Sequence, residues 1–163
     1  VASAIAALNP AAVVASDLSR ARETAELVAA GLGHTVVLDP RLREKDFGLW
    51  EGLTGEEIAA GWPAEYATWR SGQHPVGFES ETRGAVGERF ASGVEDAAAE
   101  LSSSDTLLVV AHGACIAAGI TTLLGLDADS WVGIRGIGNC HWSVLGSSDR
   151  EPRWRLEGHN VSA

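Results

Sequence analysis

Arg20 is the first of three polar positions whose residue type and place in the sequence could support chemistry. It lies in segment 16–21, directly after the apolar run 11–15. If that run is a strand followed by a helix, Arg20 falls in the first helical turn, where backbone amides and the helix dipole favour an anion. Its guanidinium would add two donors for a phosphate or carboxylate. The competing interpretation is an ordinary solvated arginine.

His112 is the second position, and it follows the apolar run 107–111. Gly113 comes next and lets the backbone approach a ligand closely. The imidazole could hold one oxygen of a phosphoryl group while the amides of Gly113 and Ala114 hold others. The competing interpretation is a histidine bonded to a backbone carbonyl.

Glu44 is the third position, a few residues before Phe47 and Trp50. Aromatic side chains that exclude water from a carboxylate make it easier to protonate, which a general acid needs near neutral pH. The alternative is a surface carboxylate paired with Lys45.

The elements that must position these residues follow an α/β pattern. A strand over 11–15, a helix over 18–32 capped by Ser16 or Asp17, and a strand over 35–39 predict a parallel sheet. The remaining expected elements are a helix over 1–8, a long helix capped by Ser80, a buried strand over 106–111, a helix ending near Gly125, and strands over 140–145 and 153–156.

Segment 41–80 is less regular than the rest. Thr54 and Glu57 have the spacing of a capping box, and Pro63 can start a second short helix. Irregular segments between core elements commonly shape the mouth of a pocket. We therefore expect residues 54–80 to form a lid or specificity segment within a single domain that spans 1–163.

Composition excludes several classes of function. The chain has 163 residues, 12 Lys+Arg and 22 Asp+Glu, which gives a net charge of −10. This acidic balance argues against nucleic-acid binding. The longest apolar runs are far shorter than the ~20 residues of a membrane span. Lys45 is the only lysine and is not followed by Ser or Thr, which excludes a P-loop.

The two cysteines, Cys115 and Cys140, are too few for a disulfide framework, so we expect reduced thiols in a cytoplasmic protein. With their neighbours they read His112-x-x-Cys115 and Cys140-His141, which could in principle bind zinc. Neither half has a standard ligand spacing, and a buried cysteine is commonly a small hydrophobe. We expect no metal and no cofactor.

Order and spacing of the motifs resemble the histidine phosphatase superfamily, which has the phosphoglycerate mutase-like fold. The matching segments are 16–25 (Ser-x-Leu-x-Arg-Ala-x-x-Thr-Ala), 42–52 (Leu-x-Glu-x-x-x-Gly-x-Trp-Glu-Gly), 79–80 (Glu-Ser) and 111–113 (Ala-His-Gly). The resemblance implies a three-layer α/β/α domain with a mostly parallel central sheet. It also implies hydrolysis of a small phosphomonoester through a phosphohistidine, without metal. Arg20 and His112 would bind the phosphoryl group, and Glu44 would protonate the leaving oxygen and then activate water.

One departure concerns the nucleophile. The family begins with a strand ending in Arg-His-Gly, whose histidine is phosphorylated, and this chain has neither that tripeptide nor a Met. We expect the 163 residues to start inside a longer protein, with the missing central strand about 30–40 residues upstream at ordinary element lengths. Without that histidine, residues 1–163 alone should not hydrolyse a substrate.

Three alternatives stay open at this point. A phosphoglycerate mutase-type phosphotransferase would differ in shielding the phosphoenzyme from water, and a non-catalytic phosphate-ligand binder would lack the nucleophile. Within the superfamily, segments 42–54, 131–142 and 153–156 resemble actinobacterial phosphatases acting on glucosyl-3-phosphoglycerate, but α-ribazole phosphatases share the Glu44 segment. A homodimer is among the oligomeric states that the sequence allows.

Overall fold

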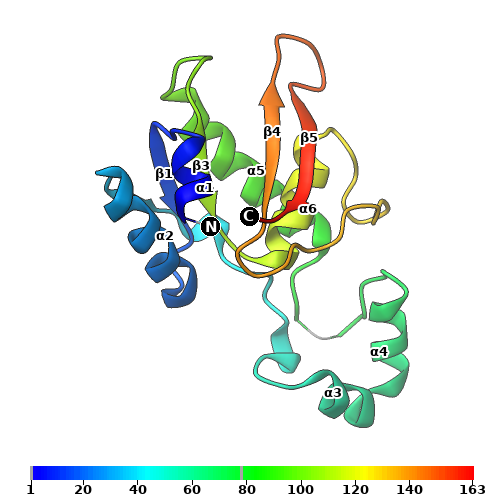
Figure 1. Cartoon of the computed structure of the whole chain (residues 1–163). Coiled ribbons are helices and arrows are strands. Elements are labelled where there is room, and N and C mark those ends of the chain that lie inside the picture. Colours follow the sequence, from blue (N-terminus) through cyan, green and yellow to red (C-terminus); the bar gives the residue numbers. More distant parts are fainter. Residues whose placement is uncertain (1, 78) are drawn as a thin grey trace.

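A computed structural model describes residues 2–77 and 79–163 (Figure 1). The strands are β1 (Ala12–Ala15), β2 (Val36–Leu38), β3 (Leu107–Val110), β4 (Trp142–Ser147) and β5 (Trp154–Val161). The helices are α1 (Ala2–Ala7), α2 (Ser19–Leu32), α3 (Gly55–Gly61), α4 (Pro63–Arg70), α5 (Arg83–Ala99) and α6 (Gly113–Leu123). Two predictions touch undescribed residues, because the helix expected from Val1 and the segment 54–80 each include one of them (Val1 and Phe78).

The central layer is a parallel sheet in the order β2-β1-β3. Side chains alternate across a strand, so each strand packs on two layers. Val13 and Ala15 of β1 face Ala25 and Ala29 of α2, while Val14 faces the layer formed by α5 and α6. The predicted three-layer α/β/α arrangement with a parallel sheet is confirmed.

Close packing of α5 on α6 depends on small residues. A Cβ added at Gly119 of α6 would collide with the ring of Phe90 on α5. A Cβ at Gly87 of α5 would collide with Thr122 and lie 2.9 Å from the carbonyl of Ala118. These glycines let the two helices approach closely, and Phe90 fills the contact at 4% exposure.

Strands β4 and β5 form a separate antiparallel hairpin. Leu145 and Leu156 of this hairpin pack against Ile120 of α6 and Ile134, and Figure 1 shows the hairpin beside α6. Within the described residues, β4 has no hydrogen-bonded partner other than β5, and β3 pairs only with β1. The two sheets are therefore joined through helix packing.

Helices α3 and α4 stand apart from the rest of the chain (Figure 1). We call residues 55–70 the lobe, and residues 2–46 and 83–163 the body. The capping box predicted at Thr54 and Glu57 is present with both of its hydrogen bonds, and Pro63 begins α4 as predicted. Neither helix contains a buried residue.

Two predicted helix caps are wrong. The N-cap of α2 is Leu18, which has no side-chain cap, because the buried Ser16 hydroxyl accepts the Leu18 amide and also contacts the imidazole of His112. The long helix starts later than expected, because Thr82 rather than Ser80 accepts the amide of Ala85.

Candidate active site

The three predicted polar positions meet at the carboxyl ends of β1 and β3. Arg20 lies in the first turn of α2, just beyond β1, and His112 is the N-cap of α6, just beyond β3. Because β1 and β3 are adjacent and parallel, both turns open on the same edge of the sheet. Glu44 reaches this edge from the loop that follows β2.

His112 is held in place by a buried hydroxyl. Its Nε2 lies 2.9 Å from Oγ of Ser16, and both residues are buried. Burial lowers the pKa of His112, the nearby positive charge of Arg20 lowers it further, and the carboxylate of Glu44 opposes this shift. The imidazole is therefore favoured in its neutral form, and Arg20 and Glu44 both lie within electrostatic reach of it.

Glu44 docks on the N-terminus of α6. Its Oε1 accepts the amide of Cys115 at 2.9 Å, and its Oε2 accepts the amide of Ala114 at 3.2 Å. Oε1 also accepts the amide of Lys45 at 2.8 Å. The positive end of the helix dipole favours a carboxylate at this position.

This placement changes two of the sequence predictions. The Ala114 amide already donates to Glu44, so we no longer assign it to a phosphate oxygen. The Glu44 carboxylate is surrounded by backbone amides, a polar environment that the sequence did not predict. Trp50 lies edge to face with Trp69 of the lobe, at 6.2 Å between ring centres. Lys45 contributes its backbone amide to Glu44, and no side-chain ion pair between the two is found in the described part of the chain.

Arg89 on α5 fixes the loop that carries Glu44. Its guanidinium forms a two-pronged ion pair with Glu81, with both distances 2.8 Å. It also donates to the carbonyls of Arg41, Arg43 and Glu44 at 2.6, 2.7 and 3.0 Å. Sequence reasoning missed this residue, because the three carbonyls that it binds lie more than 40 positions away and leave no local pattern.

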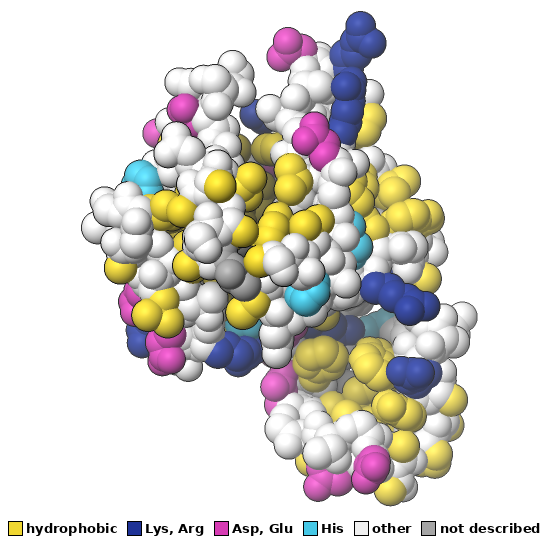
Figure 2. All heavy atoms as spheres, in the orientation of Figure 1, with side chains coloured by type: hydrophobic (Ala, Val, Ile, Leu, Met, Phe, Trp, Pro, Cys, Tyr) yellow, Lys and Arg dark blue, Asp and Glu magenta, His cyan; other side chains and the backbone are white. Residues whose placement is uncertain are grey.

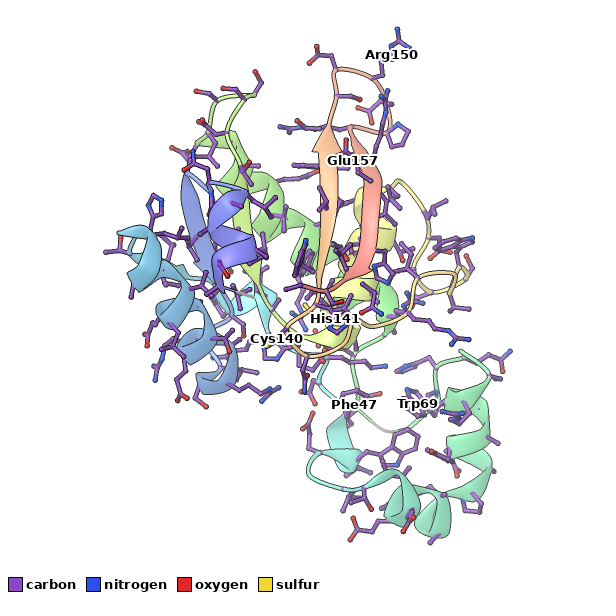
Figure 3. The ribbon with its side chains drawn as sticks, viewed as in Figure 1. Phe47, Trp69, Cys140, His141, Arg150 and Glu157 are labelled. Carbon is purple, nitrogen blue, oxygen red and sulfur yellow. The ribbon has the colours of Figure 1, made fainter. Side chains whose placement is uncertain are left out.

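A pocket of about 190 Å³ adjoins Glu44. Lys45 and Ala114, which both donate backbone amides to Glu44, line one side of it. Arg83 of α5, Phe47 and Trp69 line the rest, together with the wall formed by α6. Phe47 and Trp69 lie where the lobe meets the body (Figure 3). No local pattern in the sequence predicts that Arg83 lines this pocket.

Two of the four residues considered for zinc, His112 and Cys115, have other partners. His112 faces Ser16, and the thiol of Cys115 lies 3.6 Å from the carbonyl of Leu42. Burial raises the pKa of Cys115 to about 12, which disfavours the thiolate that a metal needs. Across residues 2–77 and 79–163, no group of three His, Cys, Asp or Glu side chains could hold a metal ion. None of the helices in that part of the chain is long and apolar enough to cross a bilayer.

Comparison with known proteins gives consistent matches. A sequence model of the Histidine phosphatase superfamily (branch 1) matches residues 1–161. The chain is 34% identical to a glucosyl-3-phosphoglycerate phosphatase of Mycolicibacterium vanbaalenii, over 98% of this chain and 77% of that protein. It is 32% identical to a probable phosphoglycerate mutase of Erwinia tasmaniensis, over 90% of this chain and 66% of that protein. A solved mycobacterial glucosyl-3-phosphoglycerate phosphatase, in complex with inorganic phosphate, superposes with a TM-score of 0.87 at 34% identity, covering 99% of this chain and 82% of that one.

Proposed function

The chain belongs to the histidine phosphatase superfamily, and we propose that Arg20, Glu44 and His112 perform its phosphomonoester hydrolysis. The observation that carries this proposal is their convergence at one edge of the sheet, with His112 braced by Ser16 and Glu44 docked on α6. Arg20 and His112 would hold the phosphoryl oxygens through charge-assisted hydrogen bonds. The backbone amide of Gly113, the first residue of α6, would donate to a further phosphoryl oxygen.

Glu44 would carry the proton. In the first step its protonated form gives a proton to the oxygen that leaves phosphorus, and in the second step the carboxylate takes a proton from the attacking water. The amides of Ala114 and Cys115 fix the orientation of both carboxylate oxygens. This fixed orientation supports a single group acting in both steps.

The phosphoryl acceptor is the part of the mechanism that residues 1–163 do not supply. None of the five histidines has Arg before it and Gly after it. In the described part of the chain β3 pairs with β1 alone, and a parallel strand on its other side would bring a histidine at its carboxyl end close to His112. The activity test therefore uses protein expressed from the complete reading frame, with residues 1–163 alone as a comparison.

For the substrate we propose glucosyl-3-phosphoglycerate, the compound named for the relatives that match most of the chain. A mutase-type phosphotransfer is the second candidate, because a probable phosphoglycerate mutase also matches 90% of the chain. The short lobe, whose helices bury no residue, favours hydrolysis because it shields a phosphoenzyme from water only weakly. We place the reaction in the cytoplasm, since both cysteines are free thiols, and we expect neither a nucleic-acid nor a membrane partner.

Phosphate release from p-nitrophenyl phosphate and glucosyl-3-phosphoglycerate tests the assignment. We expect Glu44→Gln and His112→Ala to lower kcat/KM by about 10²–10⁴-fold, the usual contribution of a positioned acid or base. Glu157→Gln is the matched control, because Glu157 lies on the distant β4–β5 hairpin (Figure 3). Unchanged rates in both site variants would refute the roles given to Glu44 and His112. Conversion of 3-phosphoglycerate to 2-phosphoglycerate faster than phosphate release would favour the mutase.

A further inference from the structure

Lys45 and Arg83 differ from the other partly buried basic residues. Arg22, Arg41 and Arg89 each have a carboxylate within 4.0 Å. Among the described residues, Lys45 and Arg83 are the partly buried cations for which no such carboxylate is found. Both line the pocket beside Glu44.

Neutral groups hold both of these side chains. The Arg83 guanidinium donates to the carbonyls of Ala117 and Ile134 and to the hydroxyl of Thr121, at 3.2–3.4 Å. Nζ of Lys45 lies 5.6 Å from the ring centre of Phe47, a cation–π contact. Long hydrogen bonds and a cation–π contact offset the cost of burying a positive charge less well than a carboxylate does.

Burial disfavours the charged form of both side chains. Burial lowers the pKa of Lys45 and that of Arg83. The carboxylates of Glu81 and Asp129 oppose this shift at Lys45, and that of Asp129 opposes it at Arg83. Arg83 is also the first residue of α5, where the helix dipole disfavours a positive charge. The nearby acids each have another hydrogen-bond partner, since Glu81 binds Arg89, Asp129 accepts the amide of Gly84, and Glu44 accepts the amide of Cys115.

We propose that Lys45 and Arg83 form a second anion subsite, which binds the carboxylate of a substrate whose phosphate sits at Arg20 and His112. This inference rests on the proposed function. Phe47 and Trp69 form an apolar wall of the subsite, and a charge pair beside an apolar wall is stronger than one in bulk water. The preferred substrate class is therefore a phosphorylated hydroxy acid, such as a phosphoglycerate or its derivative.

The acidic surface makes this preference distinctive. With a net charge of −10, the protein as a whole repels a ligand that carries an additional carboxylate. Tighter binding of the more acidic ligand would therefore require local cations. Figure 2 shows Lys and Arg side chains at the junction of body and lobe, where the pocket lies.

Two ligands that differ only in the carboxylate test the subsite. 3-Phosphoglycerate carries it, and glycerol 3-phosphate has a hydroxymethyl group in its place. Calorimetric titration would give Kd for each ligand, both on residues 1–163 and on protein from the complete reading frame. We expect Lys45→Met and Arg83→Met each to weaken 3-phosphoglycerate binding about tenfold or more, as for one lost charge-assisted bond, and glycerol 3-phosphate binding by less than about threefold.

Two further variants control this experiment. Lys45→Arg keeps the charge and should retain most of the preference for 3-phosphoglycerate. Arg150→Met removes the same charge from the tip of the distant hairpin and should leave both affinities unchanged (Figure 3). If Arg83→Met does not fold, because the hydrogen bonds of Arg83 to its carbonyl partners are lost, the affinities of Lys45→Met alone test the subsite.

The outcomes separate the subsite from the function itself. Equal losses for both ligands, or no loss in Lys45→Met, would overturn the subsite while phosphatase activity stands. A protein that neither binds nor hydrolyses either ligand, nor any other phosphomonoester offered, would refute the proposed function as well.

Discussion

The body and the lobe are held together in different ways. In the body, alternating strand residues and closely packed helices bury a continuous core that includes Val14, Phe90 and Val94. In the lobe, α3 and α4 bury no residue, and stability comes from aromatic contacts such as the stacked pair of Tyr66 and Trp69, 5.7 Å apart. In Figure 2 hydrophobic side chains of the lobe lie toward the body.

This difference separates two tasks. Arg20, Glu44 and His112, which we propose for the chemistry, all belong to the body, so that chemistry would depend on the packing of the body. The lobe contributes Trp69 to the pocket beside Glu44 and can therefore affect which substrates enter without holding the reacting groups. Substitutions in the body should change stability and rate together, and substitutions in the lobe should mainly change substrate affinity.

The largest contrast is expected between Phe90→Ala and Tyr66→Ala. Phe90 is 4% exposed in the centre of the α5–α6 contact, so its truncation should lower the free energy of unfolding by about 3–5 kcal/mol. Tyr66 lies partly exposed on Trp69, so its truncation should cost only the aromatic pair, about 0.5–1.5 kcal/mol. Urea denaturation of both variants measures the difference. Equal losses would show that the lobe is an integral part of the core.

A smaller loss of stability is expected when Arg89 of the body no longer holds the loop that leads to the lobe. Arg89→Met leaves the Glu81 carboxylate and three backbone carbonyls without their donor. Because both side chains of the pair are about a quarter exposed, we expect a loss of about 2–3 kcal/mol rather than that of a fully buried charge.

Arg43→Met is the matched control, because Arg43 pairs with Asp17 at the surface and should change stability little. Phosphatase activity is the second measurement. Arg89→Met should lower kcat more than KM changes, since the displaced loop carries Glu44. Full activity in Arg89→Met would show that the loop is held by other contacts.

Local patterns in the sequence were enough to predict most of the body. The apolar runs before Ser16 and His112, and the Gly33 that ends α2 in a left-handed conformation, are signals within a few residues of each other. The capping box at Thr54 and Glu57 is equally local. Such features are visible because their physics involves neighbouring residues only.

Tertiary contacts account for what the sequence did not reveal. Ser16 reads as a helix cap until β3 brings His112 against it, and the Ala114 amide reads as a phosphate ligand until Glu44 occupies it. Arg89 and Arg83 read as ordinary helix arginines, because the carbonyls that they bind lie more than 30 positions away in the sequence. Each of these corrections concerns a polar group whose partner is fixed by packing rather than by sequence spacing.

The smallest contrast compares the same substitution in the two regions. Gly119→Ala places a methyl group against the Phe90 ring, which is buried and cannot move aside, so overpacking should lower stability by about 1–3 kcal/mol. Gly61→Ala, in the last turn of α3, places its methyl group in open space. There the better helix propensity of alanine should raise stability by up to about 1 kcal/mol. Thermal unfolding of the two variants should therefore shift in opposite directions. A shift in the same direction would mean either that α5 and α6 can separate without loss, or that α3 has less helical character than its capping box indicates.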